Sequence, residues 1–236
     1  MFSLFMKRIW RNKWLLIKMF VFSPFISILP VILINQYTVN ISSERILCMC
    51  IWSFIYFSTF ENVNLKIRDG TGSKMVDILL SERNIFEKHL LEKVALIFSF
   101  LPSFFLSLIM YIKIYNLDLN INKTIYSIVC MILFANFIMD SSLYLELRYK
   151  NYFHKFNVFM NIMYILAGIL YEITSLPIFL RIFSYLIPIT YVFHYIYSDN
   201  SKYILIFIPM LTLYTIITKM LLIHVERQYR RFGGAI

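Results

Sequence analysis

Apolar residues occur along this chain in long blocks, separated by short stretches that hold most of the charges. An α-helix needs about 20 apolar residues to cross the ~30 Å hydrocarbon core of a membrane. Six blocks come close to that length, and each predicts a spanning helix: residues 15–34, 46–60, 94–112, 121–144, 158–171 and 203–225. The pattern therefore predicts an all-α membrane protein with six transmembrane helices in a single domain, residues 1–236.

The composition agrees with lipid as the solvent of this chain. Apolar residues make up 60% of it and charged residues only 15%, whereas a soluble domain is about 45–50% apolar. A soluble domain of this length would bury its apolar residues in one core, not in repeated membrane-sized blocks.

Residues 1–14 predict an amphipathic helix that lies in the membrane interface before the first span. The apolar face holds Phe2, Phe5, Met6 and Ile9, and the opposite face holds Lys7, Arg8 and Arg11. Trp10 and Trp14 suit the depth of the lipid headgroups. A cleavable signal peptide fits less well, because no small-x-small cleavage pattern follows the apolar stretch.

Lysine and arginine fall mainly on one side of the predicted membrane. That side receives Lys7, Arg8, Arg11, Lys13, Lys66, Arg68, Lys74, Arg83, Lys88, Lys93, Arg148, Lys150, Lys155, Arg227, Arg230 and Arg231. The other side receives Arg45, Lys113, Lys123, Arg181 and Lys202. Because short cytoplasmic loops are enriched in basic residues, we expect a multi-pass protein of the cell (plasma) membrane with both termini in the cytoplasm.

The net charge of +10 does not indicate nucleic acid as a partner. The basic residues are divided among four short segments next to spans, whereas a nucleic-acid site gathers them on one face. The membrane itself is the expected partner, and anionic lipid would be favoured by these charges.

Residues with catalytic or metal-binding chemistry are few and scattered. Cys48 and Cys50 point some 200° apart around a helix, so we expect free buried thiols instead of a metal site. His89, His154, His194 and His224 form no pair at metal-ligand spacing, and no carboxylate is expected beside them. Asp140 is the deepest acidic residue and the best intramembrane candidate, although it can also cap against a neighbouring helix or reach the interface.

The segment Arg68–Met75 is not a phosphate-binding loop, which needs Gly, four residues and then Gly-Lys-Ser/Thr after a strand. No Gly-x-Ser-x-Gly elbow or paired catalytic carboxylates occur either. We therefore expect no bound cofactor and no enzyme activity, and a protein that moves something across the membrane.

Residues 61–93, between the second and third spans, predict two short helices on the cytoplasmic side. Ser73 is a plausible N-cap for an amphipathic helix with an apolar stripe, and Asn84 with Glu87 resembles a capping box that opens the helix leading into the third span. Two interpretations stay open. The first helix either lies against lipid or the bundle, or it docks a cytosolic partner.

Taken in order, four features resemble the permease subunits of ABC-2 type transporters over nearly the whole chain. They are the amphipathic basic helix before the first span; Glu61 followed by Gly70-Thr71 and Leu79-Leu80-Ser81; the stretch AGILYEITSLPIFLRIFSYLIPITYVFHYIY at Ala167–Tyr197; and the basic tail VERQYRRFGG. One departure is Glu82-Arg83, where the family often has proline.

The resemblance implies a fold and a set of partners. It implies a cytoplasmic coupling helix between spans two and three, and a pair of re-entrant helices between spans five and six. It also implies a second permease copy, as a homodimer or related heterodimer, and a cytosolic ATP-binding subunit that holds ATP and Mg. The function it implies is export of a lipid, drug or peptide-like substrate.

The resemblance also assigns roles to residues. The predicted docking residues for the ATPase are Gly70, Thr71, Ser73, Met75, Val76, Leu79, Leu80, Ser81 and Asn84. The predicted coupling charges are Glu61 and Arg148, although either can also be an interfacial charge facing water. The re-entrant segment contains Glu172, Leu176, Pro177, Arg181 and Pro188, with Glu172 and Arg181 expected at the outer surface.

Two other function classes remain open. An ATP-independent six-span channel or secondary carrier would need intramembrane ionisable residues or inverted repeats. A membrane-embedded enzyme would need clustered His, Asp or Cys near an interface, and the sequence supplies no such cluster.

Overall fold

The computed structural model describes residues 2–24, 42–68, 85–116, 118–149, 152–169 and 173–232. Within these ranges the chain is mostly helical and contains no strand. The elements are α1 (Phe2–Arg11), α2 (Lys13–Ile17), η1 (Lys18–Phe22), α4 (Ser43–Arg68), α6 (Ile85–Tyr115), α7 (Ile121–Arg148), α8 (Tyr152–Leu166), η2 (Ile173–Ser175), α9 (Ile178–Tyr185), α10 (Pro188–Ser198) and α11 (Lys202–Phe232).

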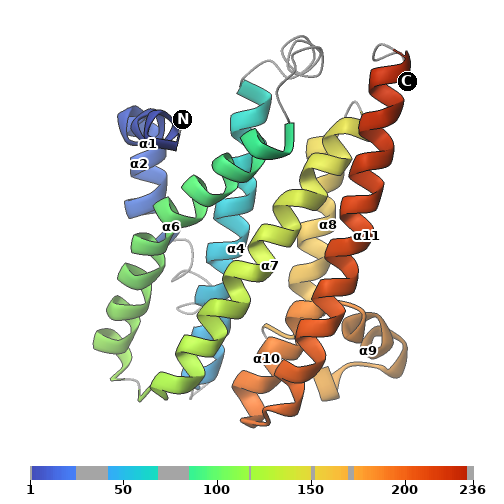
Figure 1. Ribbon diagram of the computed structural model, residues 1–236. Coiled ribbons are helices and arrows are strands. Elements are labelled where there is room, and N and C mark those ends of the chain that lie inside the picture. The colour runs from blue at the N-terminus through green and yellow to red at the C-terminus, as the bar shows by residue number, and fades with distance from the viewer. Residues whose placement is uncertain are drawn as a thin grey trace.

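The long helices run side by side as a bundle, and the two ends of the chain lie at the same end of it (Figure 1). We call this the terminal end of the bundle. The opposite end, called the far end, carries the α6–α7 and α10–α11 connections.

Among the described residues, four helices, α4, α6, α7 and α11, are long and apolar enough to cross a membrane. The pair α9 and α10, bent by 105°, makes a fifth crossing if it is counted as one. The four long helices contain the predicted spans 46–60, 94–112, 121–144 and 203–225, which are confirmed as apolar helices of spanning length. A multi-pass membrane protein is compatible with this architecture.

The other two predicted spans are described only in part. The first, 15–34, is described as far as Pro24. For the fifth, 158–171, the structure has α8, which ends at Leu166 and turns through Gly168 at φ 79°. Its 15 residues rise about 22 Å, short of the ~30 Å that a straight crossing needs. The count of six spans stays a prediction.

Helix α4 lies at the centre of the bundle. Its apolar stretch is 78% buried, whereas that of α11 is only 17% buried. It packs extensively against both α6 and α7, which contact each other much less. Because α4 separates its two neighbours, it fixes where their side chains can meet.

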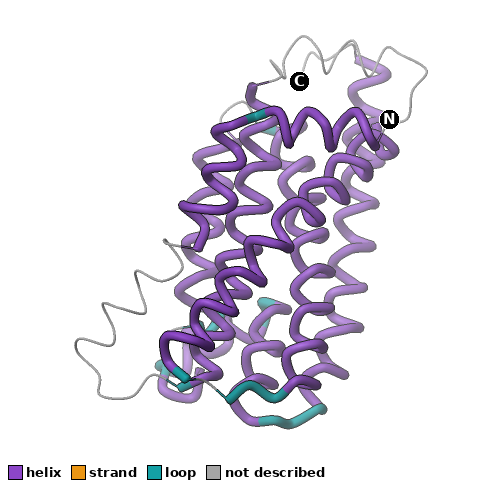
Figure 2. The backbone as a smooth tube through the Cα atoms, turned by 90° about the vertical axis from the view of Figure 1, so that its left-hand side faces the viewer, coloured by secondary structure: helices purple, strands orange, loops and turns teal. Residues whose placement is uncertain are grey.

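At the terminal end, α1 lies across the bundle instead of along it (Figure 2). Ile9 is buried there, and Met6 Sδ lies 3.7 Å from the Ser99 hydroxyl of α6. Trp10 and Trp14 are exposed on the same segment. The chain turns between α1 and α2 at Asn12, whose side-chain oxygen accepts a hydrogen bond from the Leu15 amide at 3.3 Å.

The turn η1 is wider than an α-helix, since the Ser23 amide bonds the Lys18 carbonyl five residues back. In this spacing the Met19 carbonyl would accept from residue 24, which is proline and has no N–H. The Ser103 hydroxyl of α6 donates to that carbonyl instead. A buried carbonyl without a partner costs free energy, so this bond ties η1 to α6.

We expect Ser103→Ala to lower the free energy of unfolding by about 1–3 kcal/mol, because the Met19 carbonyl then stays buried without a donor. The matched control is Ser107→Ala. Ser107 is equally buried, but its hydroxyl bonds only the Ser103 carbonyl of its own helix at 2.9 Å. Thermal unfolding in mild detergent measures both variants, and equal losses for the two would contradict the assignment.

Candidate functional site

Three ionisable side chains meet inside the bundle between α6 and α7. Asp140 Oδ1 lies 2.5 Å from Lys93 Nζ and 3.3 Å from His89 Nε2. All three side chains are less than about a tenth exposed. We call this group the buried charge cluster.

Helical spacing explains how α6 contributes two members. His89 and Lys93 are four residues apart, so they lie on one face, one turn above the other. Asp140 reaches them from α7. It lies eight residues before Arg148, the last residue of that helix, and this spacing is about 12 Å along the helix axis. The cluster therefore lies within the apolar lengths of both helices, toward the terminal end.

A lone carboxylate at this depth would be strongly unfavourable, since desolvation of an ion costs several kcal/mol. Lys93 and His89 compensate Asp140 through short contacts. Lys219 of α11 is exposed and close enough to repel Lys93. Within the cluster, Lys93 and, when protonated, His89 face the carboxylate of Asp140, so a change in protonation alters the balance of charge among them.

The sequence indicates one member of this cluster, Asp140, but not its contacts with His89 and Lys93. Asp140 was predicted as the deepest acid, but the expectation that no carboxylate lies beside a histidine is wrong for His89. Asp140 is 47 positions from Lys93 in the chain, so only helix packing brings them together. The four-residue spacing of His89 and Lys93 was the one local signal available.

The two predicted coupling charges are not brought together. Glu61 is buried on α4 and pairs with Lys18 Nζ of η1 at 3.2 Å, a lysine whose side chain is about half exposed. Arg148 is exposed at the end of α7. The neighbour of Glu61, Asn62, donates to Ser142 Oγ at 3.4 Å and so joins α4 to α7.

A second polar arrangement surrounds the broken segment between α8 and α11. Pro177 precedes α9, and Pro188 begins α10 at its first turn. Because proline has no N–H and restricts the residue before it, both positions favour helix boundaries. The predicted pair of short helices is therefore present as α9 and α10, with Leu176, Pro177 and Pro188 at their ends.

Side chains supply donors to carbonyls that the helix breaks leave open. Arg181 Nη2 donates to the Thr174 carbonyl and, at 3.0 Å, to the Leu176 carbonyl. The Tyr191 hydroxyl donates to the Tyr185 carbonyl at 2.9 Å, and the Tyr214 hydroxyl of α11 to the Leu186 carbonyl at 3.0 Å. Such capping is what irregular backbone needs at membrane depth.

Arg181 is partly exposed and bonds two carbonyls of its own segment. Its place at the outer surface of the membrane stays a prediction. Glu172, the other residue expected at the surface, lies outside the described residues.

The predicted docking residues between Gly70 and Asn84 also lie outside the described residues. In the part that the structure describes, no group of three His, Cys, Asp or Glu residues is arranged to hold a metal ion. Cys48 and Cys50 are free and buried, which confirms the prediction for these thiols, and Cys130 is free and buried as well.

No protein-family model, curated protein or solved structure matches this chain. A function for this protein can therefore be inferred only from its own residues and from how they are arranged.

We expect Asp140→Asn to lower the free energy of unfolding by about 3–5 kcal/mol, because Lys93 then stays buried without a counter-charge. The double variant Lys93→Met/Asp140→Leu removes the ion pair and should recover most of that loss. Thermal unfolding in detergent measures both. A stability of Asp140→Asn equal to that of the unaltered chain would show that the pair is not buried in the protein.

Proposed function

We propose that this chain is the transmembrane permease subunit of an ATP-driven exporter of the ABC-2 type. In this proposal it has six spans, lies in the plasma membrane with both termini in the cytoplasm, and pairs with a second permease copy. A separate cytosolic subunit binds ATP and Mg, and the substrate is a lipid, drug or peptide-like molecule.

The observation that carries the proposal is the broken helix pair before the last long helix. The residues that resemble the family's fifth-span and Leu-Pro region, Ala167–Tyr197, include η2, α9 and α10. The resemblance implies that α9 and α10 form a pair of helices that re-enters the membrane. The capped carbonyls at Tyr185 and Leu186 support membrane immersion of this segment.

Two further features support the same proposal. An amphipathic helix, α1, precedes the first predicted span and lies across the terminal end, where the family has an interfacial helix. The basic segments that flank the described helices, such as Arg148 and Arg227, also belong to that end. The docking residues from Gly70 to Asn84 are assigned from the sequence resemblance alone.

A carrier that works without ATP is the second candidate, and the buried charge cluster favours it. Intramembrane ionisable groups mark ion and proton pathways in such proteins. In this candidate, Asp140 exchanges a proton as the contacts with His89 and Lys93 change. In the exporter, the same cluster joins α6, which follows the docking segment, to α7.

Affinity purification in mild detergent tests the first candidate. We expect the tagged chain to co-purify with a Walker-type ATPase subunit, and Leu79→Asp to lose it while the chain stays folded in the membrane. His154→Asp is the control, because it adds a negative charge at an exposed position of the same end.

Two results separate the candidates. Absence of any ATPase subunit, together with no ATP-dependent transport in vesicles, would contradict the exporter. A proton flux that stops in Asp140→Asn under the same conditions would instead favour the carrier. If the Leu79→Asp variant still co-purified with the ATPase subunit, the docking contact would lie outside the predicted helix.

A further inference from the structure

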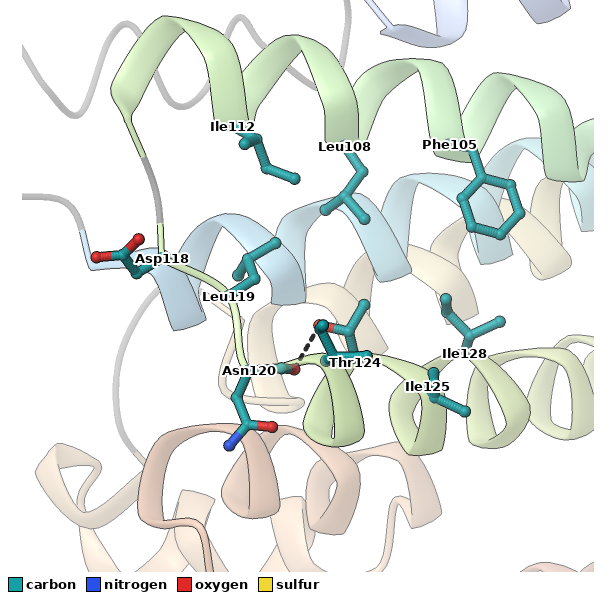
Figure 3. Close-up of a pocket in the computed structure, with 10 residues that line it drawn as sticks. Phe105, Leu108, Ile112, Asp118, Leu119, Asn120, Thr124, Ile125 and Ile128 are labelled. Carbon is teal, nitrogen blue, oxygen red and sulfur yellow. Dashed lines mark hydrogen bonds between the residues drawn. The ribbon is translucent and has the colours of Figure 1, made fainter.

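A groove of about 800 Å³ lies between α6 and α7 at the far end of the bundle (Figure 3). From α6, Phe105, Leu108 and Ile112 point toward α7. Ile125 and Ile128 stand on the opposite wall. Its size falls within the ~300–1,000 Å³ typical of small-molecule sites.

The groove follows from how the helices pack. Residues 105, 108 and 112 repeat at three and four positions, so they form one stripe on α6, and residues 121, 125 and 128 do the same on α7. Because α4 packs against both helices and separates them, the two stripes face each other without closing. Two apolar walls are left with space between them.

The groove opens sideways, toward the surroundings of the bundle. Ile121 is 73% exposed, Ile125 54% and Phe105 44%. All of these residues belong to the apolar lengths of α6 and α7 that suit a membrane. Water in such a space would have few polar partners, so an apolar chain from the membrane is the favoured occupant.

The polar groups of the groove gather at its outer mouth. Asn120 Oδ1 accepts from the Lys123 amide at 3.2 Å, and its carbonyl accepts from the Thr124 hydroxyl at 2.9 Å. These atoms are therefore used within the N-terminal turn of α7. Asp118 is exposed and is the one charged group among the described lining residues, and its carboxylate points outward from the end of the groove, away from the apolar side chains (Figure 3).

The neighbouring lysines leave this carboxylate available. Lys123 is mostly buried and bonds the Ile196 carbonyl at 3.1 Å, with Asp199 3.5 Å away. Lys113, on the last turn of α6, is exposed and does not line the groove. An apolar slot with a carboxylate at its mouth is complementary to an alkyl chain that ends in a cation.

We propose that this groove binds the alkyl chain of a cationic amphiphile from the membrane, with its ammonium group at Asp118. The apolar walls contact the alkyl chain, and the Asp118 carboxylate binds the ammonium head group. The site needs neither the ATPase partner nor the buried charge cluster, so it stands or fails separately from the proposed function.

Saturable binding of radiolabelled hexadecylamine to the full chain in phosphatidylcholine nanodiscs tests the proposal. Ile125→Trp fills the groove from an exposed position and should weaken binding at least tenfold. The control is Ile109→Trp, a substitution at a similarly exposed isoleucine of α6 that does not line the groove, and it should bind as the unaltered chain does.

The head group is tested with hexadecanol as a competitor of the same chain length. Asp118→Asn should weaken amine binding about threefold to fivefold, as expected for an exposed charge pair, and leave the alcohol unchanged. Equal effects of the two tryptophan variants would overturn the groove as the site. Equal affinity of the unaltered chain for amine and alcohol would overturn the role of Asp118.

A change of oligomeric state in Ile125→Trp alone, measured by light scattering in detergent, would overturn the proposal in another way. It would make the groove a contact between two copies of the chain. Size-exclusion profiles of each variant show whether it is folded.

Discussion

A polar group buried in a membrane bundle has no water to bond, so the chain itself must supply its partner. This constraint acts at two interruptions of the described helices. At η1, the carbonyl of Met19 faces a proline without an N–H, and the Ser103 hydroxyl takes the place of that donor. At the α9–α10 break, tyrosine hydroxyls cap the carbonyls of Tyr185 and Leu186. Both of these interruptions are therefore also ties between two elements.

The same constraint governs the charges. Asp140 is tolerated inside the bundle because Lys93 and His89 lie beside it, and the pairing joins α6 to α7 where few other contacts do. Glu61 is balanced by Lys18 in a comparable way. Proton binding or release changes the charge of such a cluster, which cannot happen at an apolar contact, and the proposed carrier uses this property.

The sequence predicted those parts of the fold that depend on local composition. Apolar length alone located α4, α6, α7 and α11. The pair of short helices is expected from the family resemblance, and the prolines at 177 and 188 lie where these helices begin. The sequence did not locate the end of α8, because the residues around Gly168 are as apolar as the helix before them. Nor did it locate the partners of Asp140, since contacts across helices have no signature in a single chain.

Cysteine labelling with a membrane-impermeant maleimide on intact cells tests directly whether the described helices cross a membrane and whether α9 lies within it. The three native cysteines are buried and should not react. Asn200→Cys, in the far-end turn, should react on intact cells, and Gln228→Cys, at the terminal end, only after lysis. Ile182→Cys, on the exposed apolar face of α9, should stay unlabelled in the intact membrane. Equal labelling of positions 200 and 228, or rapid labelling at 182, would contradict the account.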